Sequence, residues 1–257
     1  MKSLNTMSNH APRTEWLAAF FEKGNEFFSE HNLGPEQISF FKRLLKDAGL
    51  VDKNKVTSFG ELISSLGWDT APSLGLILLN LVFENPQVEW YVANLDIGRL
   101  YARKDAEELL IAFDVKPPVA KSICGAFKRL TETPFGTVLR WGFITEDGDL
   151  VRTKCSVSDP RVVLYGLYKF AYKCNGYKEF TLATLLNDSI DRDGISPTRV
   201  FGLDRDDMTP FLLGLTAKYP KFITASFTHD LEKITLAEDK TSEDVLDLFK
   251  AGEASHD

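Results

Sequence analysis

The sequence predicts a mainly α-helical fold with small β-hairpins, arranged as tandem winged-helix-like units. Apolar residues recur at helical spacing through most of the long segments. Between residues 104 and 155, two expected helices precede two short strands that flank an Asp-Gly turn, which is a hairpin signal. Helices followed by a hairpin return between residues 161 and 236, although no stretch of sequence is repeated.

This order of elements predicts a division of the chain into successive segments. The first residues contain Ser, Asn and Pro without periodicity, so we expect them to be flexible. In the middle domain, the helix 119–130 is the candidate recognition helix and the hairpin is the candidate wing. The expected segments are a flexible N-terminus (1–13), a helical winged-helix-like domain (14–100), a winged helix-turn-helix domain (101–158), a helical domain with a C-terminal β-hairpin (159–250) and a tail (251–257).

In the first domain, breaks and caps delimit the helices. A helix starts at Thr14 and has a weak point at Gly24, and a second starts at Pro35, where a missing N–H costs nothing. Two short extended pieces follow within residues 50–57. We expect Thr57 to cap a helix 59–66, Ser73 to cap an apolar helix 73–83, and Asn85-Pro86 to start another helix.

In the third domain, the same signals predict four helices and a hairpin. Residues 161–173 form an apolar helix that contains several tyrosines, which we assign to core or interface. Thr181 and Asp204 are expected to cap the next helices, and the latter helix ends before Tyr219-Pro220. Strands are expected at 222–227 and 231–236, with a short amphipathic helix at 241–249.

The tetrapeptide pattern Thr-x-Phe-Gly occurs twice, as Thr57-Ser58-Phe59-Gly60 and Thr133-Pro134-Phe135-Gly136. Threonine can cap a helix, phenylalanine can anchor in the core, and glycine allows close approach of the backbone. We therefore predict a structural role for this pattern rather than a catalytic one.

Composition restricts the classes of function. The net charge of −7 disfavours indiscriminate coating of nucleic acid, although a local basic face is still compatible with it. No apolar run reaches the roughly 18–20 residues of a membrane span, and the N-terminus lacks a signal-peptide pattern, so we expect a cytoplasmic protein without a membrane partner. The three scattered cysteines fit a reducing compartment, and we expect no cofactor or metal.

Motifs of catalysis are missing from the sequence. The four histidines do not have the spacing of a metal-binding motif, and no phosphate-binding glycine loop is present. The acidic stretch 187–194 lacks the ligand spacing of a calcium-binding loop. We therefore expect the chain not to be an enzyme in its own right.

Basic residues gather in the middle domain. Lys121 and Lys128 are seven residues apart and share one face of the candidate recognition helix. Such cations can contact phosphates, whereas the alternatives are contact with a protein or an ordinary solvated surface. The candidate nucleic-acid-binding residues are Lys116, Lys121, Lys128, Arg129, Arg140, Trp141, Arg152 and Lys154.

Several segments resemble a known group of proteins. These segments are Asn85-Pro86 to Val92, Thr133 to Gly136, Asp159 to Ala171, Phe201-Gly202-Leu203, Tyr219-Pro220, Phe222-Ile223 and Leu231 to Asp239. They resemble the C-terminal, non-catalytic region of phosphoadenosine phosphosulfate reductase-family fusion proteins of anaerobes, over roughly residues 35 to 249. A weaker similarity links the chain to uncharacterised proteins encoded beside DNA phosphorothioation systems.

The resemblance implies an accessory role beside a reductase-family, ATP-pyrophosphatase-type enzyme. The phosphate-binding loop and cysteines of that catalytic domain have no counterpart here, so no catalytic residue carries over. Our first hypothesis is a nucleic-acid-binding accessory subunit of a sulfur-modification or phage-defence system. The alternative is a protein-protein interaction module that docks on the enzyme without touching nucleic acid.

Overall fold

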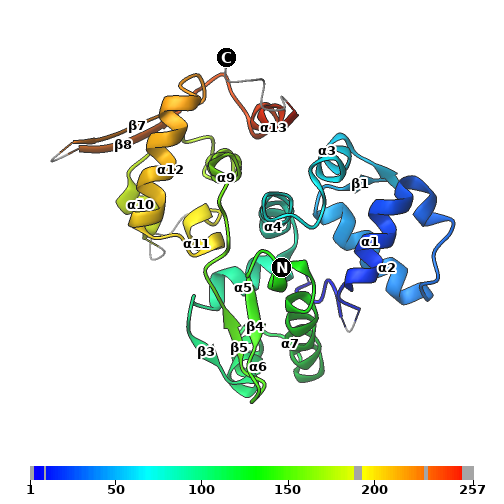
Figure 1. The fold of residues 1–257 in the computed structure, drawn as a ribbon. Helices are drawn as coiled ribbons and strands as arrows, with labels where there is room; N and C mark the ends of the chain where they lie inside the picture. Colours follow the sequence, from blue (N-terminus) through cyan, green and yellow to red (C-terminus); the bar gives the residue numbers. More distant parts are fainter. Residues whose placement is uncertain (1–2, 9, 188–192, 229–230, 251–257) are drawn as a thin grey trace. The chain divides into compact units, whose positions relative to one another are not determined.

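The structure, a computed structural model, describes residues 3–8, 10–187, 193–228 and 231–250. The fold is mainly helical with small antiparallel sheets, as the sequence predicts. The chain forms two compact units, residues 1–156 (unit 1) and 157–257 (unit 2) (Figure 1). The boundary expected between residues 100 and 101 falls inside unit 1, because the strand that contains Leu100 and Tyr101 pairs with a strand at residues 150–152. The expected tail 251–257 lies outside the described residues.

Unit 1 begins with helices and a small hairpin and ends with a three-stranded sheet. Its elements are α1 (Thr14–Lys23), the 3₁₀ helix η1 (Gly24–Phe28), α2 (Pro35–Asp47), β1 (Val51–Asp52), β2 (Lys55–Val56), α3 (Ser58–Leu66), α4 (Ala71–Glu84), α5 (Pro86–Asn94), β3 (Leu100–Tyr101), α6 (Arg103–Ala112), α7 (Pro117–Thr131), α8 (Pro134–Thr137), β4 (Gly142–Ile144) and β5 (Leu150–Arg152). Helix α4 is buried on nearly every side, which agrees with its largely apolar sequence.

Several helix starts in unit 1 follow local sequence signals, whereas the start of α4 differs from the expected one. The Asn85 side chain accepts hydrogen bonds from the backbone of Gln87 and Val88 and so caps α5. The predicted cap Ser73 is wrong, because α4 begins at Ala71 after Thr70. Ser73 instead accepts a hydrogen bond from the Thr70 hydroxyl at 3.1 Å and is buried.

The N-terminal segment is ordered, which corrects the expected flexibility of residues 1–13 for the part that the structure describes. The side chains of Thr6, Met7 and Ala11 are buried. The backbone N–H groups of Thr6 and Met7 donate to the Gln87 side-chain oxygen at 2.9 and 3.1 Å. Gln87 in turn donates to the Tyr91 hydroxyl at 2.7 Å. A polar side chain in α5 thus holds a segment that lacks any periodic pattern of its own.

Both Thr-x-Phe-Gly segments have the predicted structural role. The Thr57 hydroxyl accepts a hydrogen bond from the Gly60 N–H at 3.0 Å, and Phe59 is buried. A Cβ atom on Gly60 would lie 2.5 Å from the Leu50 carbonyl oxygen. A Cβ atom on Gly136 would lie 1.9 Å from a backbone oxygen, so the close approach of the backbone requires glycine at both positions.

The sheet of unit 1 has the order β3-β5-β4, with the helices α6, α7 and α8 between β3 and β4 in the chain. Tyr101 pairs with Leu150, which pairs with Ile144, and this row faces the core. The row formed by Leu100, Val151 and Phe143 faces the opposite side. The predicted hairpin 138–155 is therefore present, and a third strand that was not expected from the sequence extends it.

Unit 2 repeats this connectivity with different residues. Its elements are α9 (Pro160–Lys173), β6 (Glu179–Phe180), α10 (Leu182–Leu186), α11 (Pro197–Phe201), α12 (Arg205–Lys218), β7 (Ile223–Thr228), β8 (Leu231–Leu236) and α13 (Ser242–Lys250). The sheet order is β6-β8-β7, and β7 packs beside α12 (Figure 1). Thr181 and Asp204 cap α10 and α12 as the sequence predicts.

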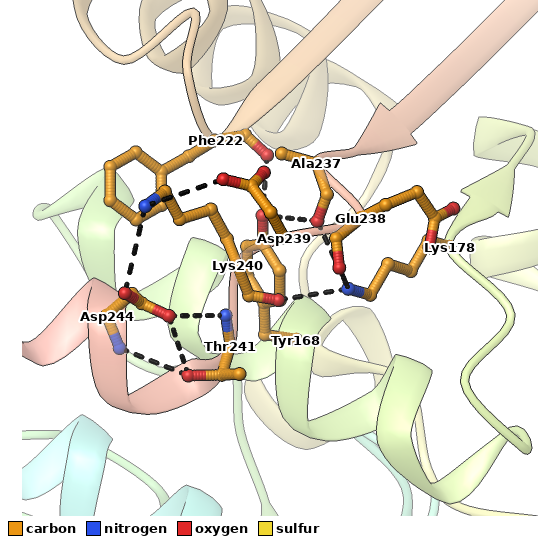
Figure 2. A network of polar contacts seen from close by, with 9 residues as sticks. All are labelled: Tyr168, Lys178, Phe222, Ala237, Glu238, Asp239, Lys240, Thr241 and Asp244. Carbon is orange, nitrogen blue, oxygen red and sulfur yellow. Dashed lines mark hydrogen bonds and ion pairs between the residues drawn. The ribbon is translucent and has the colours of Figure 1, made fainter.

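The segment between β8 and α13 is fixed by a polar network (Figure 2). The Lys178 ammonium donates to the carbonyl oxygens of Ala237, Glu238 and Lys240 at 3.1, 2.7 and 3.0 Å. The Tyr168 hydroxyl donates to the Phe222 carbonyl oxygen at 2.7 Å. Burial raises the pKa of Tyr168, so this hydroxyl stays a donor at neutral pH. The network uses these polar groups internally, which indicates a structural role.

Candidate binding surfaces

Helix α7 presents a basic face to solvent. Pro117 stands at its first turn, where the missing N–H costs nothing, and one side of the helix packs against α6 and the β4–β5 hairpin. The opposite side carries Lys121, Gly125 and Lys128 at helical spacing, and both lysines are exposed. Lys116 is exposed directly before the helix. Lys116, Lys121 and Lys128 thus lie exposed on or next to one helix, which also contains Arg129.

Gly125 lies between the two lysines of this face. A Cβ atom there would meet nothing within 4 Å, and its backbone is helical without a positive φ. Neither packing nor conformation therefore requires glycine, and a helix-interior glycine costs about 1 kcal/mol relative to alanine. The absent side chain leaves a shallow gap between two cations, where the backbone of a ligand could come close.

Acidic groups lie beside the basic face at the C-terminal end of α7 and reduce its positive charge there. Lys128 pairs with Glu132 at 4.0 Å between Nζ and Oε1. Arg129 is half-buried and lines a polar groove of about 440 Å³ together with Glu132 and residues 12–15. The groove contains Arg13 and Arg129 but also Glu15 and Glu132, so no single sign of charge prevails in it.

Two predicted contact residues are buried, and this corrects their assignment. Trp141 is 1% exposed and packs against Phe127, with ring centroids 5.3 Å apart. Arg152 is 0% exposed, and its Nη1 donates to the carbonyl oxygens of Val92 and Leu95 at 2.9 and 3.0 Å. The arginine therefore satisfies the free carbonyl groups at the end of α5, so neither side chain is available to a nucleic acid.

The remaining predicted cations, Arg140 and Lys154, are exposed at one end of the β4–β5 hairpin. The Thr153 backbone N–H donates to the Trp141 carbonyl at 3.1 Å, which places residues 140 and 154 just beyond the strands. The other end is the turn Glu146-Asp147-Gly148-Asp149, which has three carboxylates. The tip of the expected wing is thus acidic, and it would repel a phosphate backbone.

Helix α12 of unit 2 takes the place that α7 takes in unit 1, but its exposed face is apolar. The exposed residues along it include Pro210, Leu213, Gly214 and Ala217, and Leu213 is 49% exposed. Its first turn carries Asp206 and Asp207. This surface was not expected from the sequence, although residues 211–215 are apolar at successive helix positions and so cannot all face the core.

The outward row of the unit 1 sheet is also apolar. Leu100 is 61% exposed and Phe143 is 48% exposed, whereas Val151 between them on the central strand is only 4% exposed. This surface was not expected from the sequence either. The signal was the pair of adjacent apolar residues in both Phe143-Ile144 and Leu150-Val151, because a strand with consecutive apolar residues has two apolar faces.

No catalytic constellation is visible in the described part of the chain. Burial raises the pKa of the Cys124 and Cys155 thiols to about 12, so neither is a ready nucleophile at neutral pH. Among the residues that the structure describes, no three His, Cys, Asp or Glu side chains gather in a way that could hold a metal ion. Likewise, no described helix has the length and apolar character needed to cross a membrane.

Comparisons with protein-family models, with curated proteins and with solved structures give no match for this chain. The candidate surfaces are therefore interpreted from their own chemistry: a basic face on α7, an apolar face on α12 and an apolar row on the sheet of unit 1.

Proposed function

We propose that the chain is a non-catalytic accessory subunit that holds a nucleic acid against α7. The observation that carries this proposal is the solvent face of α7, where Lys121 and Lys128 flank the unobstructed Gly125 and Lys116 stands at the N-terminal end. Cations in this arrangement neutralise phosphates and gain affinity by releasing counterions. The acidic hairpin turn confines the proposed contact to the helix.

The connectivity of both units supports the proposal. Each unit has a helix, a strand, further helices and then a hairpin whose second strand lies in the middle of the sheet. This order is typical of a winged helix-turn-helix domain. In that plan α7 would be the recognition helix of unit 1. The sequence resemblance adds the setting, a reductase-family partner in a sulfur-modification or phage-defence system.

A gel-shift titration tests the nucleic-acid contact. The full chain is titrated into labelled duplex DNA, single-stranded DNA and RNA at about 50 and 200 mM salt, a range over which phosphate contacts weaken strongly. The variant Lys121→Glu/Lys128→Glu should lose binding, and the slope of log affinity against log salt should fall by about 2 for duplex DNA. The matched control Lys55→Glu/Lys104→Glu makes the same charge change at two exposed lysines outside α7. Equal loss in both variants, or none in either, would reject a role for this face.

The apolar face of α12 favours a second candidate function, docking on a partner protein. Leu213 is half exposed between small residues, so a partner helix could approach closely, and the aspartates of the first turn would repel a nucleic acid. Affinity capture after nuclease treatment, with the natural chain and Leu213→Glu as baits, tests this candidate. A reductase-family protein captured only by the natural chain would support docking at α12, and its capture by both baits would reject it.

A further inference from the structure

Helix α7 holds the place of a recognition helix, but the side chains of its first turn cannot read a base pair. In a winged helix-turn-helix domain, residues near the N-terminus of the recognition helix make hydrogen bonds to base edges in the major groove. The residues at these positions of α7 have side chains that neither donate nor accept a hydrogen bond: Pro117, Pro118, Val119 and Ala120. Direct readout from this turn is therefore limited to apolar contact.

The backbone of the same turn offers no donor either. Proline has no N–H group, which removes this donor from Pro117 and Pro118. The N–H groups of Val119 and Ala120 both donate to the Lys116 carbonyl oxygen, at 2.9 and 3.0 Å. None of the first four residues of α7 therefore has a free N–H group, the group with which a helix N-terminus ordinarily binds a phosphate.

The exposed donors of α7 are instead ammonium groups. Lys121 and Lys128 lie on the exposed face, about 10 Å apart along the helix axis. An ammonium group attracts a phosphate as a point charge and does not impose the planar, bidentate geometry of an arginine. Arg129 has such planar donors, but it is half-buried and lines the polar groove together with Glu132. Ser122, the polar residue after Lys121, is buried.

We propose that α7 recognises a nucleic acid only as a chain of phosphates and does not distinguish its base sequence. This inference rests on the proposed function and narrows it to sequence-independent binding. Duplex DNA has a phosphate for about every 1.7 Å of its axis, so Lys121 and Lys128 meet phosphates at any position along it. The gap at Gly125 admits a backbone of any sequence, because the sugar-phosphate chain is the same throughout.

The ion pair at the C-terminal end of α7 sharpens this inference. The ammonium of Lys128 lies 4.0 Å from the Glu132 carboxylate, and both side chains are more than half exposed. An exposed pair of this kind is weak, so a phosphate can replace the carboxylate. Glu132 should therefore lower the affinity for every phosphate chain by the same factor, whatever the sequence.

Competition gel shifts test the inference with the full chain bound to a labelled DNA duplex. Unlabelled duplexes of equal length, some with A·T pairs alone and others with G·C pairs alone, should compete within about twofold of one another, whereas a protein that reads bases loses roughly five- to a hundredfold for one mismatched pair. Long-chain inorganic polyphosphate, which has no bases and no sugars, should displace the labelled duplex completely.

Two substitutions add a readout that does not depend on the choice of competitor. Lys121→Ala should weaken, and Glu132→Gln should strengthen, the binding of all duplexes by one common factor each, because a phosphate contact is the same in every sequence. The matched control is Glu108→Gln on α6, where the carboxylate pairs with Lys104, also four residues earlier, at 3.6 Å. This control frees an exposed lysine outside α7 and should leave the affinity nearly unchanged.

The possible failures of the inference and of the proposed function differ. A strongly preferred duplex, an effect of Lys121→Ala that varies with sequence, or polyphosphate that does not compete would overturn the inference and leave the proposed function standing. Binding to RNA but not to duplex DNA would do the same, since duplex DNA supplies the dense phosphate charge that suffices for this mode of contact. A chain that binds no nucleic acid at all would overturn the proposed function, and the inference with it.

Discussion

The sheets of the two units have the same connectivity, but the outward row of residues is apolar in unit 1 and polar in unit 2. In unit 1 the outward row is Leu100, Val151 and Phe143, whereas in unit 2 the corresponding row is Glu179, Thr235 and Thr224. The inward rows are alike, because Phe180, Ile234 and Ala225 are buried as Tyr101 and Leu150 are. The comparison teaches that burial fixes one face of each sheet, while the other face is free to differ.

The helices that pack on these sheets differ in the same way. The exposed face of α7 is cationic around Gly125, and that of α12 is apolar around Gly214. Each helix nevertheless buries an apolar side against its own sheet. The shared connectivity therefore does not imply a shared function. The two proposed binding roles are assigned to the exposed faces of α7 and α12 rather than to the fold.

One inward position also differs, and it gives the prediction with the largest effect. Arg152 on β5 corresponds in register to Leu236 on β8, and both side chains are 0% exposed. The change Arg152→Met leaves the carbonyls of Val92 and Leu95 without their charged donor and should destabilise unit 1 by about 3 kcal/mol.

Urea denaturation followed by tryptophan fluorescence measures this effect, because all four tryptophans lie in unit 1. The control Leu236→Met conserves volume at the matching position in unit 2 and should cost less than about 1.5 kcal/mol. If the tryptophan transition of Arg152→Met is unchanged, the hydrogen bonds of this arginine to the carbonyls at the end of α5 do not stabilise unit 1.

Sequence reasoning located most elements of both units but could not assign this arginine. Caps such as Thr57 and Asp204 act over three residues, so local sequence encodes them. Arg152 bonds to carbonyls 57 and 60 residues away, and an arginine is ordinarily expected on the surface. The pairing of Leu100 with Val151 is equally non-local, which is why the third strand and its apolar row were missed.

The difference between local signals and long-range contacts also explains which candidate binding residues were predicted correctly. Spacing within one helix correctly predicted a common exposed face for Lys121 and Lys128. The candidates on the hairpin were chosen by residue type and position in the chain, which do not say which side of a hairpin the rest of unit 1 covers. Trp141 and Arg152 were placed outward for this reason, and packing against α5 and α7 decides otherwise.

The polar network of unit 2 allows a destabilisation that should spare unit 1. Lys178→Met removes the ammonium from the carbonyls of Ala237, Glu238 and Lys240, and should cost about 2 kcal/mol because the donor is charged. The transition seen by circular dichroism should then broaden or split, whereas the tryptophan transition stays in place. A tryptophan transition that moves equally would show that the two units unfold as one.

Gly125 in α7 and Gly214 in α12 offer a smaller and more specific test. Gly125→Ala and Gly214→Ala should each stabilise the chain by about 1 kcal/mol, since neither Cβ meets an atom within 4 Å. Only Gly125→Ala should weaken nucleic-acid binding in the gel shift, because its methyl group fills the gap between Lys121 and Lys128. If Gly125→Ala binds nucleic acid as tightly as the natural chain, the nucleic acid does not come close to the backbone at Gly125, even if it contacts Lys121 and Lys128.

The smallest expected effect is a difference between the units in acid. In unit 2, a hydrogen bond from Arg205 lowers the pKa of Glu232, and one from Thr241 lowers the pKa of Asp244. A carboxyl whose pKa is lower when folded stabilises the fold above its ordinary pKa, and this contribution is lost as the pH falls through the folded pKa. In unit 1, burial raises the pKa of Asp47, although its hydrogen bond from Asn85 opposes the shift. Its contribution has the opposite sign, because protonation of this carboxyl favours the folded state.

Unit 2 should therefore lose stability before unit 1 as the pH falls below about 4.5, near the ordinary pKa of a glutamate. The side chains of Glu232 and Asp244 are partly exposed, so their contribution to stability should shrink in high salt. Thermal melts between pH 3 and 7, followed in parallel by tryptophan fluorescence and circular dichroism, separate the two responses. In Glu232→Gln/Asp244→Asn the acid sensitivity of the circular dichroism transition should decrease, whereas the tryptophan transition should not respond. The prediction would be contradicted if, in the natural chain, the tryptophan transition were more sensitive to acid than the circular dichroism transition. Glu232 and Asp244 would then not be the reason for a difference in acid stability between the units.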